Sequence, residues 1–368
     1  MHMRMGLVRL SPVQDHLNLG GAVPQTRRQF ASFCASAGLV GSTGTWAANP
    51  EGVKLRVGVS MRNSMVHLPL LLADQLGYMR QAGVTLDWSD FDAGSLAHQA
   101  LQSGQVDIMS GAFEQVLDWN EQGHKLQAFV AQSRAPQISL GIGLRQLPSF
   151  HSMADLKRFR IGVSTLGSAS HSMALVWCLQ AGLQPSEIHI VEVGNMITAM
   201  EALRAGTVDA LCHMDPLMSW LEFKRDLRVV ADTRSVQSAH LWLGGAAVSS
   251  CLFAKSEFLA QRPELIQGVA DAVVRALRWL LTAGPSDVLK TVPSSAWMGD
   301  RAFYLTTLEK VRDSFSTDGV FTDEMLQTAW RSRAMRLGLP RINAIDRGAL
   351  LAAYTNNAVT KNRKRSLT

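Results

Sequence analysis

One short stretch, Ile161–His171, carries the residue types best suited to bind an anion. It reads Ile-Gly-Val-Ser-Thr-Leu-Gly-Ser-Ala-Ser-His, a β-branched run followed by a turn rich in glycine and serine. An apolar run with helical spacing follows at once, so the turn should lie at a helix N-terminus. Backbone N–H groups and the helix dipole favour negative charge there, and serine hydroxyls add donors. The candidate ligand residues in this turn are Gly167, Ser168, Ser170 and His171.

An equivalent stretch, Val57–His67, lies 104 residues earlier in the chain. The offset aligns Ser64 with Ser168 and His67 with His171. Two facing copies of such a unit would form a cleft that closes on a small ligand. The candidates in the first half are Asn63, Ser64 and His67, together with Ser110 and Gly111 after the third predicted strand.

Each of these candidates also has a purely structural interpretation. Ser168 or Ser170 could serve only as the helix N-cap, where a serine oxygen accepts a backbone N–H. The two histidines could pack against the turn or orient it, and a pKa of ~6.5 would leave most of them neutral at pH 7. Both interpretations stay open at this point.

Three further residues are candidates for ligand contact. Asp215 follows the last strand predicted in the second half, where its carboxylate could bind a ligand amine or hydroxyl. Alternatively, it is a turn residue that precedes Pro216. Arg134 and Trp242 lie near the expected hinge, and a guanidinium can pair with an anion while an indole offers an apolar face.

The net charge of +6 is concentrated at the two ends of the chain. Residues 1–47 hold four arginines and the last eight residues hold four more basic side chains, so the rest is close to neutral. A near-neutral body excludes a broad nucleic-acid-binding surface. We expect residues 356–368 to form a disordered basic tail, with contact to nucleic acid or anionic lipid as the alternative.

The first 47 residues have the features of an export signal. Thr26-Arg27-Arg28-Gln29-Phe30 resembles the twin-arginine motif, a mildly apolar stretch follows, and Thr45-Trp46-Ala47 offers a small-x-small cleavage site. An ordinary Sec signal is the alternative. The apolar stretch is too short and too rich in glycine and serine to anchor the chain in a membrane. We therefore expect residues 1–47 to be cleaved and the protein to be exported.

Cysteine usage indicates neither a disulfide framework nor a metal site. Cys178, Cys212 and Cys251 follow the predicted signal, and no Cys-x-x-Cys pair is present. An odd number of thiols without metal-ligand spacing favours buried, unpaired cysteines. The sequence predicts no cofactor and no metal.

Strand and helix patterns alternate along the chain, which indicates an α/β fold with parallel sheets. Strands are predicted at residues 53–59, 84–88 and 106–109, and again at 156–163, 188–193 and 208–211. The blocks Ala100–Asp107 and Ala202–Asp209 match at an offset of 102 residues, each with a glycine ending a helix and an aspartate just inside the next strand. The chain therefore contains one duplicated βαβαβ unit.

The length of 368 residues allows two domains, and two stretches should connect them. Ile138–Leu144 reads as a strand leaving the first lobe and Ala246–Phe253 as a strand returning to it, which would make a two-strand hinge. Later helices predicted at 264–282, 301–315, 323–335 and 344–354 should pack against the lobes. We expect lobe 1 to comprise residues 53–140 and 245–355, and lobe 2 residues 141–244.

Several short blocks, in order, resemble the periplasmic solute-binding proteins of ABC importers, in the nitrate, sulfonate and taurine group that also contains pyrimidine-precursor binders. The resemblance covers about residues 53–290 and implies a two-lobed, type II periplasmic-binding-protein fold, with two parallel or mixed sheets flanked by helices. Ligand would lie between the lobes at the carboxyl edges of the sheets. The blocks are His67-Leu68-Pro69, Gly77-Tyr78, Gly83-Val84, Asp155-Leu156-Lys157, Ile161-Gly162-Val163, Gly167–His171, Ala181-Gly182-Leu183, Ala202–Ala210 and Asp215-Pro216.

The resemblance also implies roles. Ser168, Ser170 and nearby N–H groups would hold a sulfonate or similar anion, and the first-lobe candidates would contact its other side. Met214 stands where sulfonate binders commonly have a tryptophan, which leaves the ligand open among sulfonates, carboxylates, nitrate and pyrimidines. The expected partners are a small organic anion and a membrane permease with its ATPase, and the expected state is a periplasmic monomer.

Enzymatic interpretations fit less well. The related desulfinases use a cysteine that is absent from Ser60–Val66, and the cysteine-rich cluster of the pyrimidine synthases is also absent. Ser168 and His171 have the types of a nucleophile and a base, but no oriented acid or separate oxyanion hole is evident. We expect a binding protein without catalytic residues. A ligand-binding module of a sensor system is the alternative.

Overall fold

The computed structural model describes residues 52–339 and 353–361. The predicted export signal, most of the helix predicted at 344–354 and the last seven residues of the basic tail lie outside the described residues. Over the described ranges, none of the helices combines the length and the apolar character needed to cross a lipid bilayer.

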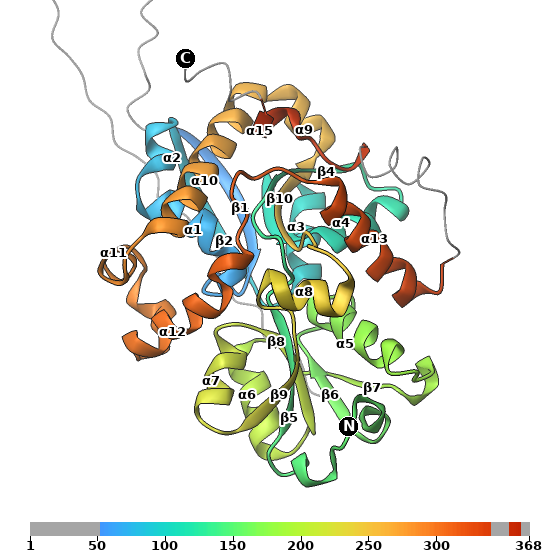
Figure 1. Ribbon diagram of the computed structural model, residues 1–368. Coiled ribbons are helices and arrows are strands. Elements are labelled where there is room, and N and C mark those ends of the chain that lie inside the picture. The colour runs from blue at the N-terminus through green and yellow to red at the C-terminus, as the bar shows by residue number, and fades with distance from the viewer. Residues whose placement is uncertain (1–51, 340–352, 362–368) are drawn as a thin grey trace, which may run out of the picture. The chain divides into compact units, whose positions relative to one another are not determined.

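The first sheet has the strand order β2-β1-β3-β10-β4 (Figure 1). β1 pairs in parallel with β2 and β3, whereas β10 runs antiparallel to both β3 and β4. We call this sheet and the helices around it lobe 1. Its strands are β1 (Val53–Ser60), β2 (Val84–Phe91), β3 (Ile108–Ala112), β4 (Leu126–Ala131) and β10 (Ser250–Lys255).

The second sheet repeats this plan with the order β7-β6-β8-β5-β9 and defines lobe 2. β6 pairs in parallel with β7 and β8, and β5 runs antiparallel to β8 and β9. The two sheets therefore correspond strand for strand, and the predicted two-lobed α/β fold with two mixed sheets is confirmed. Its strands are β5 (Ile138–Gly143), β6 (Arg160–Val163), β7 (His189–Glu192), β8 (Ala210–Met214) and β9 (Leu227–Asp232).

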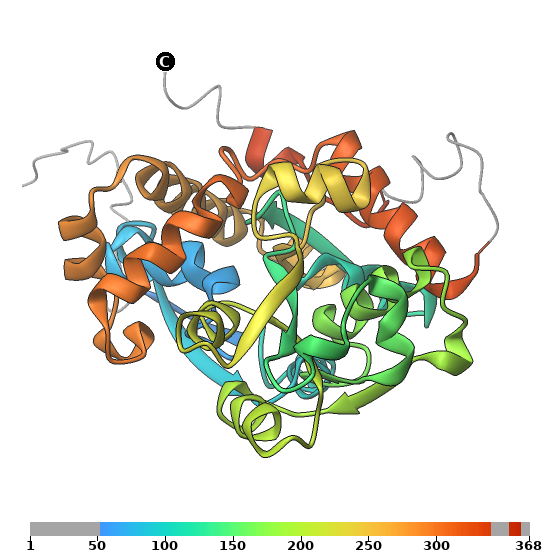
Figure 2. The ribbon, with the colours of Figure 1, turned by 60° about the horizontal axis from the view of Figure 1, so that its bottom comes forward.

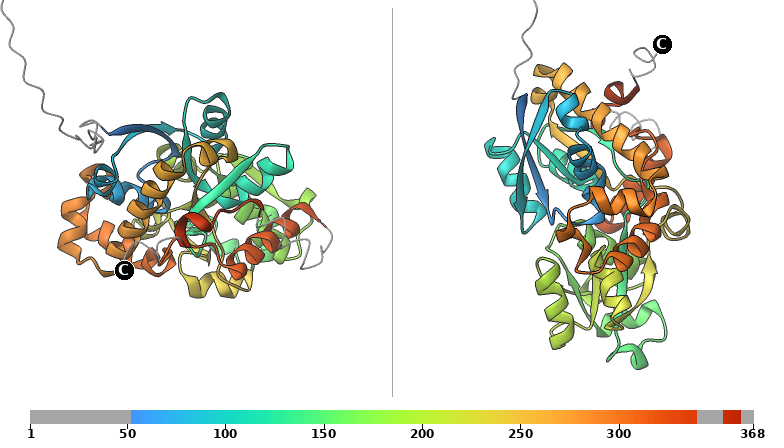
Figure 3. Two further views of the ribbon diagram at one scale, coloured as in Figure 1. Left: turned by 90° about the horizontal axis from the view of Figure 1, so that it is seen from above. Right: turned by 90° about the vertical axis from the view of Figure 1, so that its left-hand side faces the viewer.

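Helices cover both faces of each sheet, and the later helices of the chain lie along one side of lobe 1 (Figure 3). The lobe 1 helices are η1 (Met65–His67), α1 (Leu68–Gln75), α2 (Tyr78–Gln81), α3 (Gly94–Ser103), α4 (Phe113–Glu121), α9 (Ser256–Gln261), α10 (Pro263–Thr282), α11 (Pro285–Thr291), η5 (Ser294–Trp297), α12 (Arg301–Val311), η6 (Arg312–Ser314), α13 (Asp323–Leu337) and α15 (Ala358–Lys361). The lobe 2 helices are η2 (Leu147–Ser149), η3 (Met153–Arg158), α5 (Ala169–Gln180), η4 (Pro185–Glu187), α6 (Met196–Ala205), α7 (Leu217–Phe223) and α8 (Val236–Leu243).

Central strands such as β5 and β8 are buried on both faces and largely apolar, whereas the edge strands β2 and β7 are partly exposed and carry polar residues. On β8, Cys212 and Met214 face the cluster beneath α5, whereas Leu211 faces the cluster beneath α6 and α7. The long helix α10 starts at Pro263 and buries residues at three- and four-residue spacing against α1, α2 and β4, as an amphipathic helix does.

The boundaries of several elements differ from the sequence-based expectation. The strand predicted at 156–163 is shortened to β6, because Ser152 and Asp155 form a capping box that starts the 3-10 helix η3. β3 extends to Ala112 through its pairing with Ser250, so Ser110 and Gly111 lie inside the strand rather than after it. The return strand predicted from residue 246 begins at 250, and β4, α7, β9 and α8 were not predicted. Residues 356–361, at the start of the predicted disordered tail, pack against lobe 1, where the Asn356 N–H donates to the Ala128 carbonyl over 2.7 Å.

The duplication extends to a matched pair of ion pairs. Asp107 receives hydrogen bonds from the backbone and guanidinium of Arg56, and Asp209 receives the same set from Arg160. Asp107 therefore connects the start of β3 to β1, and Asp209 connects the start of β8 to β6. The preceding glycine ends a helix at φ +76° in lobe 1 and +75° in lobe 2, a conformation that favours glycine.

We predict that Asp209→Asn lowers the free energy of unfolding by about 1–3 kcal/mol at pH 7, because hydrogen bonds to a charged group are lost. The side-chain hydrogen bond from Arg160 lowers the pKa of Asp209, so the native state favours the charged form. Urea unfolding would measure the change. Asp87→Asn is the control, since its ion pair with Lys54 is exposed and should contribute under ~1 kcal/mol. Equal effects of the two substitutions would contradict the prediction.

Candidate functional site

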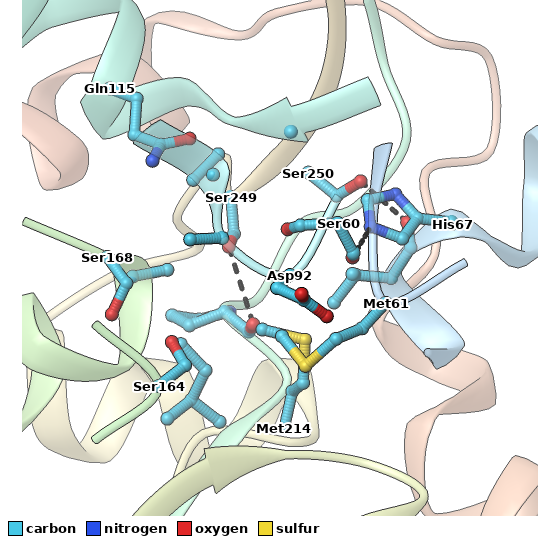
Figure 4. A pocket seen from close by; sticks show the side chains of 18 residues that line it. Ser60, Met61, His67, Asp92, Gln115, Ser164, Ser168, Met214, Ser249 and Ser250 are labelled. Carbon is cyan, nitrogen blue, oxygen red and sulfur yellow. Dashed lines mark hydrogen bonds between the residues drawn. The ribbon is translucent and has the colours of Figure 1, made fainter. Parts of the chain in front are cut away.

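A cleft of about 560 Å³, counted with the solvent at its mouth, lies between the carboxyl edges of the two sheets (Figure 4). From lobe 1 it is lined by residues at the ends of β1, β2 and β3 and at the start of β10. From lobe 2 it is lined by residues that follow β6, begin α5 and end β8. The polar lining residues are Ser60, His67, Asp92, Gln115, Ser164, Ser168, Ser249 and Ser250, and the apolar ones include Met61, Val66, Ile138 and Met214.

The N-termini of three helices meet at this cleft. Gly94, Ala112 and Ala169 line it and stand at the starts of α3, α4 and α5, which are 10, 9 and 12 residues long. The N-caps of α3 and α4 are alanines, which leave the first-turn N–H groups without a side-chain acceptor. The first N–H of α4, that of Phe113, donates to the Ser249 carbonyl over 2.6 Å. The positive ends of the three helix dipoles make the cleft attractive to negative charge.

Gln115 adds an amide to this part of the wall. It lies in the first turn of α4 and is 9% exposed. A Cβ atom at position 94 would lie 2.7 Å from its Nε2, so Gly94 allows the amide to approach the start of α3.

His67 belongs to a buried network that forms the back of lobe 1's wall. Its Nε2 lies 2.9 Å from the Ser60 carbonyl oxygen, which can only accept, so Nε2 carries the proton. Its Nδ1, 2.8 Å from Ser110 Oγ, therefore accepts from that hydroxyl. Burial lowers the pKa of His67 to about 4, so the ring is neutral at pH 7 and cannot act as a cationic anion ligand.

Gln132 continues the network towards β10. Its Nε2 donates to Ser110 Oγ over 2.8 Å and to Ser250 Oγ over 3.0 Å, and Ser250 Oγ donates to the Val66 carbonyl over 2.6 Å. These bonds hold Ser250, a lining residue, against η1. Ser110 lies behind the lining rather than in it.

The glycine-serine turn of lobe 2 is held together by Ser170. Its Oγ lies 3.0 Å from the hydroxyls of both Ser164 and Ser168 and accepts the Ser164 N–H over 3.0 Å. Ser170 is fully buried, whereas Ser164 and Ser168 reach the cleft. Ser168 is also the N-cap of α5, since its Oγ accepts the His171 N–H over 3.2 Å. Capping and a position in the cleft wall are therefore combined in one side chain.

The remaining candidates lie outside the cleft. The Gly167 N–H donates to His171 Nδ1 over 2.9 Å, so this histidine orients the turn. Ser64 Oγ donates over 3.1 Å to the carbonyl of Asp215, and this hydrogen bond connects lobe 1 to lobe 2. The Asp215 carboxylate accepts the Ser219 N–H and lies 3.6 Å from Arg234 Nη1, and burial raises its pKa.

Of the ten predicted ligand residues, the structure thus brings His67, Gly111 and Ser168 to the cleft. Ser110, Gly167, Ser170 and His171 support its walls, and Asn63 does not line it. Arg134 donates to the carbonyls of Asp313 and Phe315, and Trp242 packs edge-on against Trp177. The sequence analysis did not select Asp92, Gln115, Ser249 or Ser250.

The serine and histidine considered above as a catalytic pair, Ser168 and His171, make other hydrogen bonds. The ring of His171 bonds to Gly167 rather than to the Ser168 hydroxyl, so no nucleophile–base pair forms. Cys178, Cys212 and Cys251 are buried free thiols, and burial raises the pKa of Cys178 to about 12. In residues 52–339 and 353–361, His, Cys, Asp and Glu side chains form no group of three or more that could hold a metal ion.

A family model described as NMT1/THI5 like matches residues 64–285, more than half of the chain. The chain belongs to the NMT1/THI5-like family. An aliphatic sulfonates-binding protein of Escherichia coli K12 is 25% identical over 250 residues, which are 66% of this chain and 74% of that protein. The taurine-binding periplasmic protein of the same organism is 24% identical over 199 residues, 54% of this chain and 58% of that protein.

Solved structures share this fold. A protein of Bordetella bronchiseptica RB50 is 32% identical with a TM-score of 0.77, covering 85% of this chain and 97% of that one. The alkanesulfonate-binding protein of Xanthomonas axonopodis pv. citri, solved with bound MOPS, has a TM-score of 0.66 at 22% identity and covers 83% of this chain and 99% of its own. The latter likeness concerns the fold alone. The relatives named here by function are binding proteins.

We predict that His67 makes the protein less stable in mild acid. Its pKa is about 4 in the folded state against ~6.5 in the unfolded chain, so the unfolded state binds more protons between these values. Stability therefore falls as pH decreases from 6.5 towards 4. The loss from this group between pH 7 and 5 should be about 2 kcal/mol.

His67→Gln tests this, because an amide can also donate to the Ser60 carbonyl and accept from Ser110. Urea unfolding at pH 7, 6 and 5 should show a pH dependence about 2 kcal/mol smaller than in the wild type. Exposed His189→Gln is the control and should leave the pH dependence unchanged. An identical pH dependence in His67→Gln and wild type would contradict the prediction.

Proposed function

We propose that the protein is an extracytoplasmic solute-binding protein that captures a small organic anion between its lobes and delivers it to an ABC permease. The observation that carries the proposal is the meeting of three helix N-termini at one cleft, together with the hydroxyls of Ser164, Ser168 and Ser249. The described lining contains no lysine or arginine. Neutral donors and helix dipoles would hold the anionic group, a role that fits a sulfonate or a carboxylate.

The connection between the lobes supports a closing motion. Residues 132–137 and 246–249 run side by side, since the Ala247 N–H donates to the Arg134 carbonyl over 2.9 Å. We propose these two segments as the hinge, with lobe 2 between them. The lobes are in contact: Lys310 Nζ lies 2.7 Å from Glu222 Oε2, and the ring of Phe303 packs edge-on against Trp220. Ligand contacts from both walls would favour this contacted state over an open one.

The relatives support the same proposal. Their names describe binding of aliphatic sulfonates and of taurine, and one is named as periplasmic. Export through the signal predicted at residues 1–47, a monomeric state and the absence of catalysis are parts of the proposal.

A thermal-shift panel tests the ligand class. Alkanesulfonates, aromatic carboxylates, nitrate and pyrimidines would be compared with neutral sugars and metal cations. We expect stabilisation by one of the organic anions, because ligand bound only to the folded state raises the unfolding temperature. Stabilisation by sugars or cations alone would contradict the proposal.

Ser168→Ala should weaken that anion's binding about fivefold, the effect of one lost hydrogen bond. It should also cost about 1 kcal/mol of stability, since the N-cap of α5 is removed. Ser235→Ala is the matched control, because Ser235 caps α8 in the same lobe and does not line the cleft. Isothermal titration calorimetry should show unchanged affinity in the control. Equal affinities in both variants would mean that Ser168 acts only as a helix cap.

A further inference from the structure

A second hollow lies at the edge of the lobe 2 sheet that is opposite the cleft. The cleft lies where β8 ends, whereas this hollow lies where β8 begins and β5 ends, beside the last turn of α6 and the turn after α7. Its volume is about 590 Å³, counted with the solvent at its mouth. The charged residues that line it are Arg145, Arg204, Asp209, Arg225 and Asp226.

Positive charge is in excess in this hollow, because both aspartates are paired. Asp226 lies 2.8 Å from Arg204, and Asp209 lies 2.9 Å from Arg160, which is not part of the lining. The guanidinium groups of the other two lining arginines make no hydrogen bond or ion pair to any described residue. These two cations are therefore available to an anion from outside the chain.

The first of them, Arg145, lies over the end of α6. A Cβ atom at position 206 would lie 3.2 Å from its Nη1, so the guanidinium group approaches Gly206 closely. The carbonyl end of a helix repels anions. Here Arg160 Nη2 donates to the Gly206 carbonyl over 2.7 Å, and Arg145 adds a second positive charge. The end of α6 therefore does not exclude an anion from the hollow.

The second cation, Arg225, has a backbone conformation that arginine rarely adopts. It follows the C-cap of α7 with φ +58°. In the corresponding turn of lobe 1, after α4, the left-handed residue is Gly123, with φ +92°. Local structure alone favours glycine in such a turn, because a Cβ atom is strained there. Strained residues often lie at functional sites, and this one presents an unpaired cation to the hollow.

In lobe 1 a side chain occupies the equivalent space. Lys255 pairs with the first residue of β4 and Gly143 with the first residue of β9, so the two positions correspond. Lys255 Nζ donates over 2.7 Å to the carbonyl of Gln102, the counterpart of Arg204 at the offset of 102 residues. Gly143 has no side chain to place there. The hollow and its arginines are therefore departures of lobe 2 from the duplicated plan.

We propose that this hollow is a second anion-binding site, separate from the cleft, in which Arg145 and Arg225 bind a phosphate-type oxyanion. Each guanidinium group can present two N–H groups to the oxygens of such an anion. A tetrahedral anion has oxygens on several sides, so it can accept from arginines that belong to two different turns. Free phosphate and the headgroup of an anionic phospholipid both offer these oxygens.

Inorganic phosphate tests the first source with the full-length protein. Amide NMR spectra at pH 7 should show saturable shifts at residues 143–146, with a dissociation constant of about 1 mM, as two charge-assisted hydrogen bonds provide. Arg145→Gln should weaken binding about tenfold. Arg225→Gly should weaken it equally without lowering the unfolding temperature, because glycine suits the left-handed turn. Arg278→Gln, at an exposed arginine of α10, is the control and should bind as the wild type does.

Sedimentation with lipid vesicles tests the second source. Vesicles of phosphatidylglycerol and phosphatidylcholine in equal parts would be compared with vesicles of phosphatidylcholine alone, using the same variants. Phosphate-induced shifts at the hollow support the proposal with free phosphate as the ligand. Binding to the anionic vesicles that is lost in Arg145→Gln and Arg225→Gly, but kept in Arg278→Gln, supports it with the headgroup as the ligand.

Two results would overturn the proposal. One is the absence of both responses, including phosphate-induced shifts that are confined to the cleft. The other is equal binding by the wild type, Arg145→Gln and Arg225→Gly. Neither result bears on ligand capture between the lobes, because the hollow and the cleft lie at opposite edges of the lobe 2 sheet.

Discussion

An anion held without a basic side chain needs several backbone N–H groups aimed at one place, and this requirement shapes the whole molecule. A parallel strand followed by a helix satisfies it, because every such helix starts at the carboxyl edge of its sheet. Two copies of the unit, facing each other, bring α3 and α4 from one lobe and α5 from the other to a single cleft. The two sheets hold those helix starts in place.

The two copies have the same backbone plan but have different roles at the cleft. The matched pairs Arg56–Asp107 and Arg160–Asp209 stabilise equivalent strand starts. In lobe 2 the serine turn caps α5 and lines the cleft, whereas in lobe 1 Ser64 contacts the opposite lobe instead. A second contact between the lobes joins α13 to α8 of lobe 2 (Figure 2). His240 Nε2 on α8 lies 3.1 Å from Glu324 Oε1 on α13. Contacts between the lobes therefore occur on both sides of the cleft.

Local signals made the fold and one side of the site predictable. The duplicated strand–helix unit was visible in the sequence, because Gly206 ends a helix and Asp209 follows it in both copies' pattern. The serine turn marked the start of α5. The rest depends on long-range pairing. β10 inserts between β3 and β4, which brings Ser250 to Gln132 across 118 residues, and nothing local to Ser249-Ser250 indicates this. Asp92 is exposed, and only the packing of the two lobes places it at the mouth of the cleft.

The claim that this cleft holds a small organic anion is tested most directly by mass spectrometry of the purified protein. Spectra recorded under native conditions and again after denaturation would reveal any molecule that co-purifies. The account predicts a small compound with a sulfonate or carboxylate group that is released on denaturation. A neutral sugar or an inorganic cation released from the protein, with no acidic compound, would contradict it.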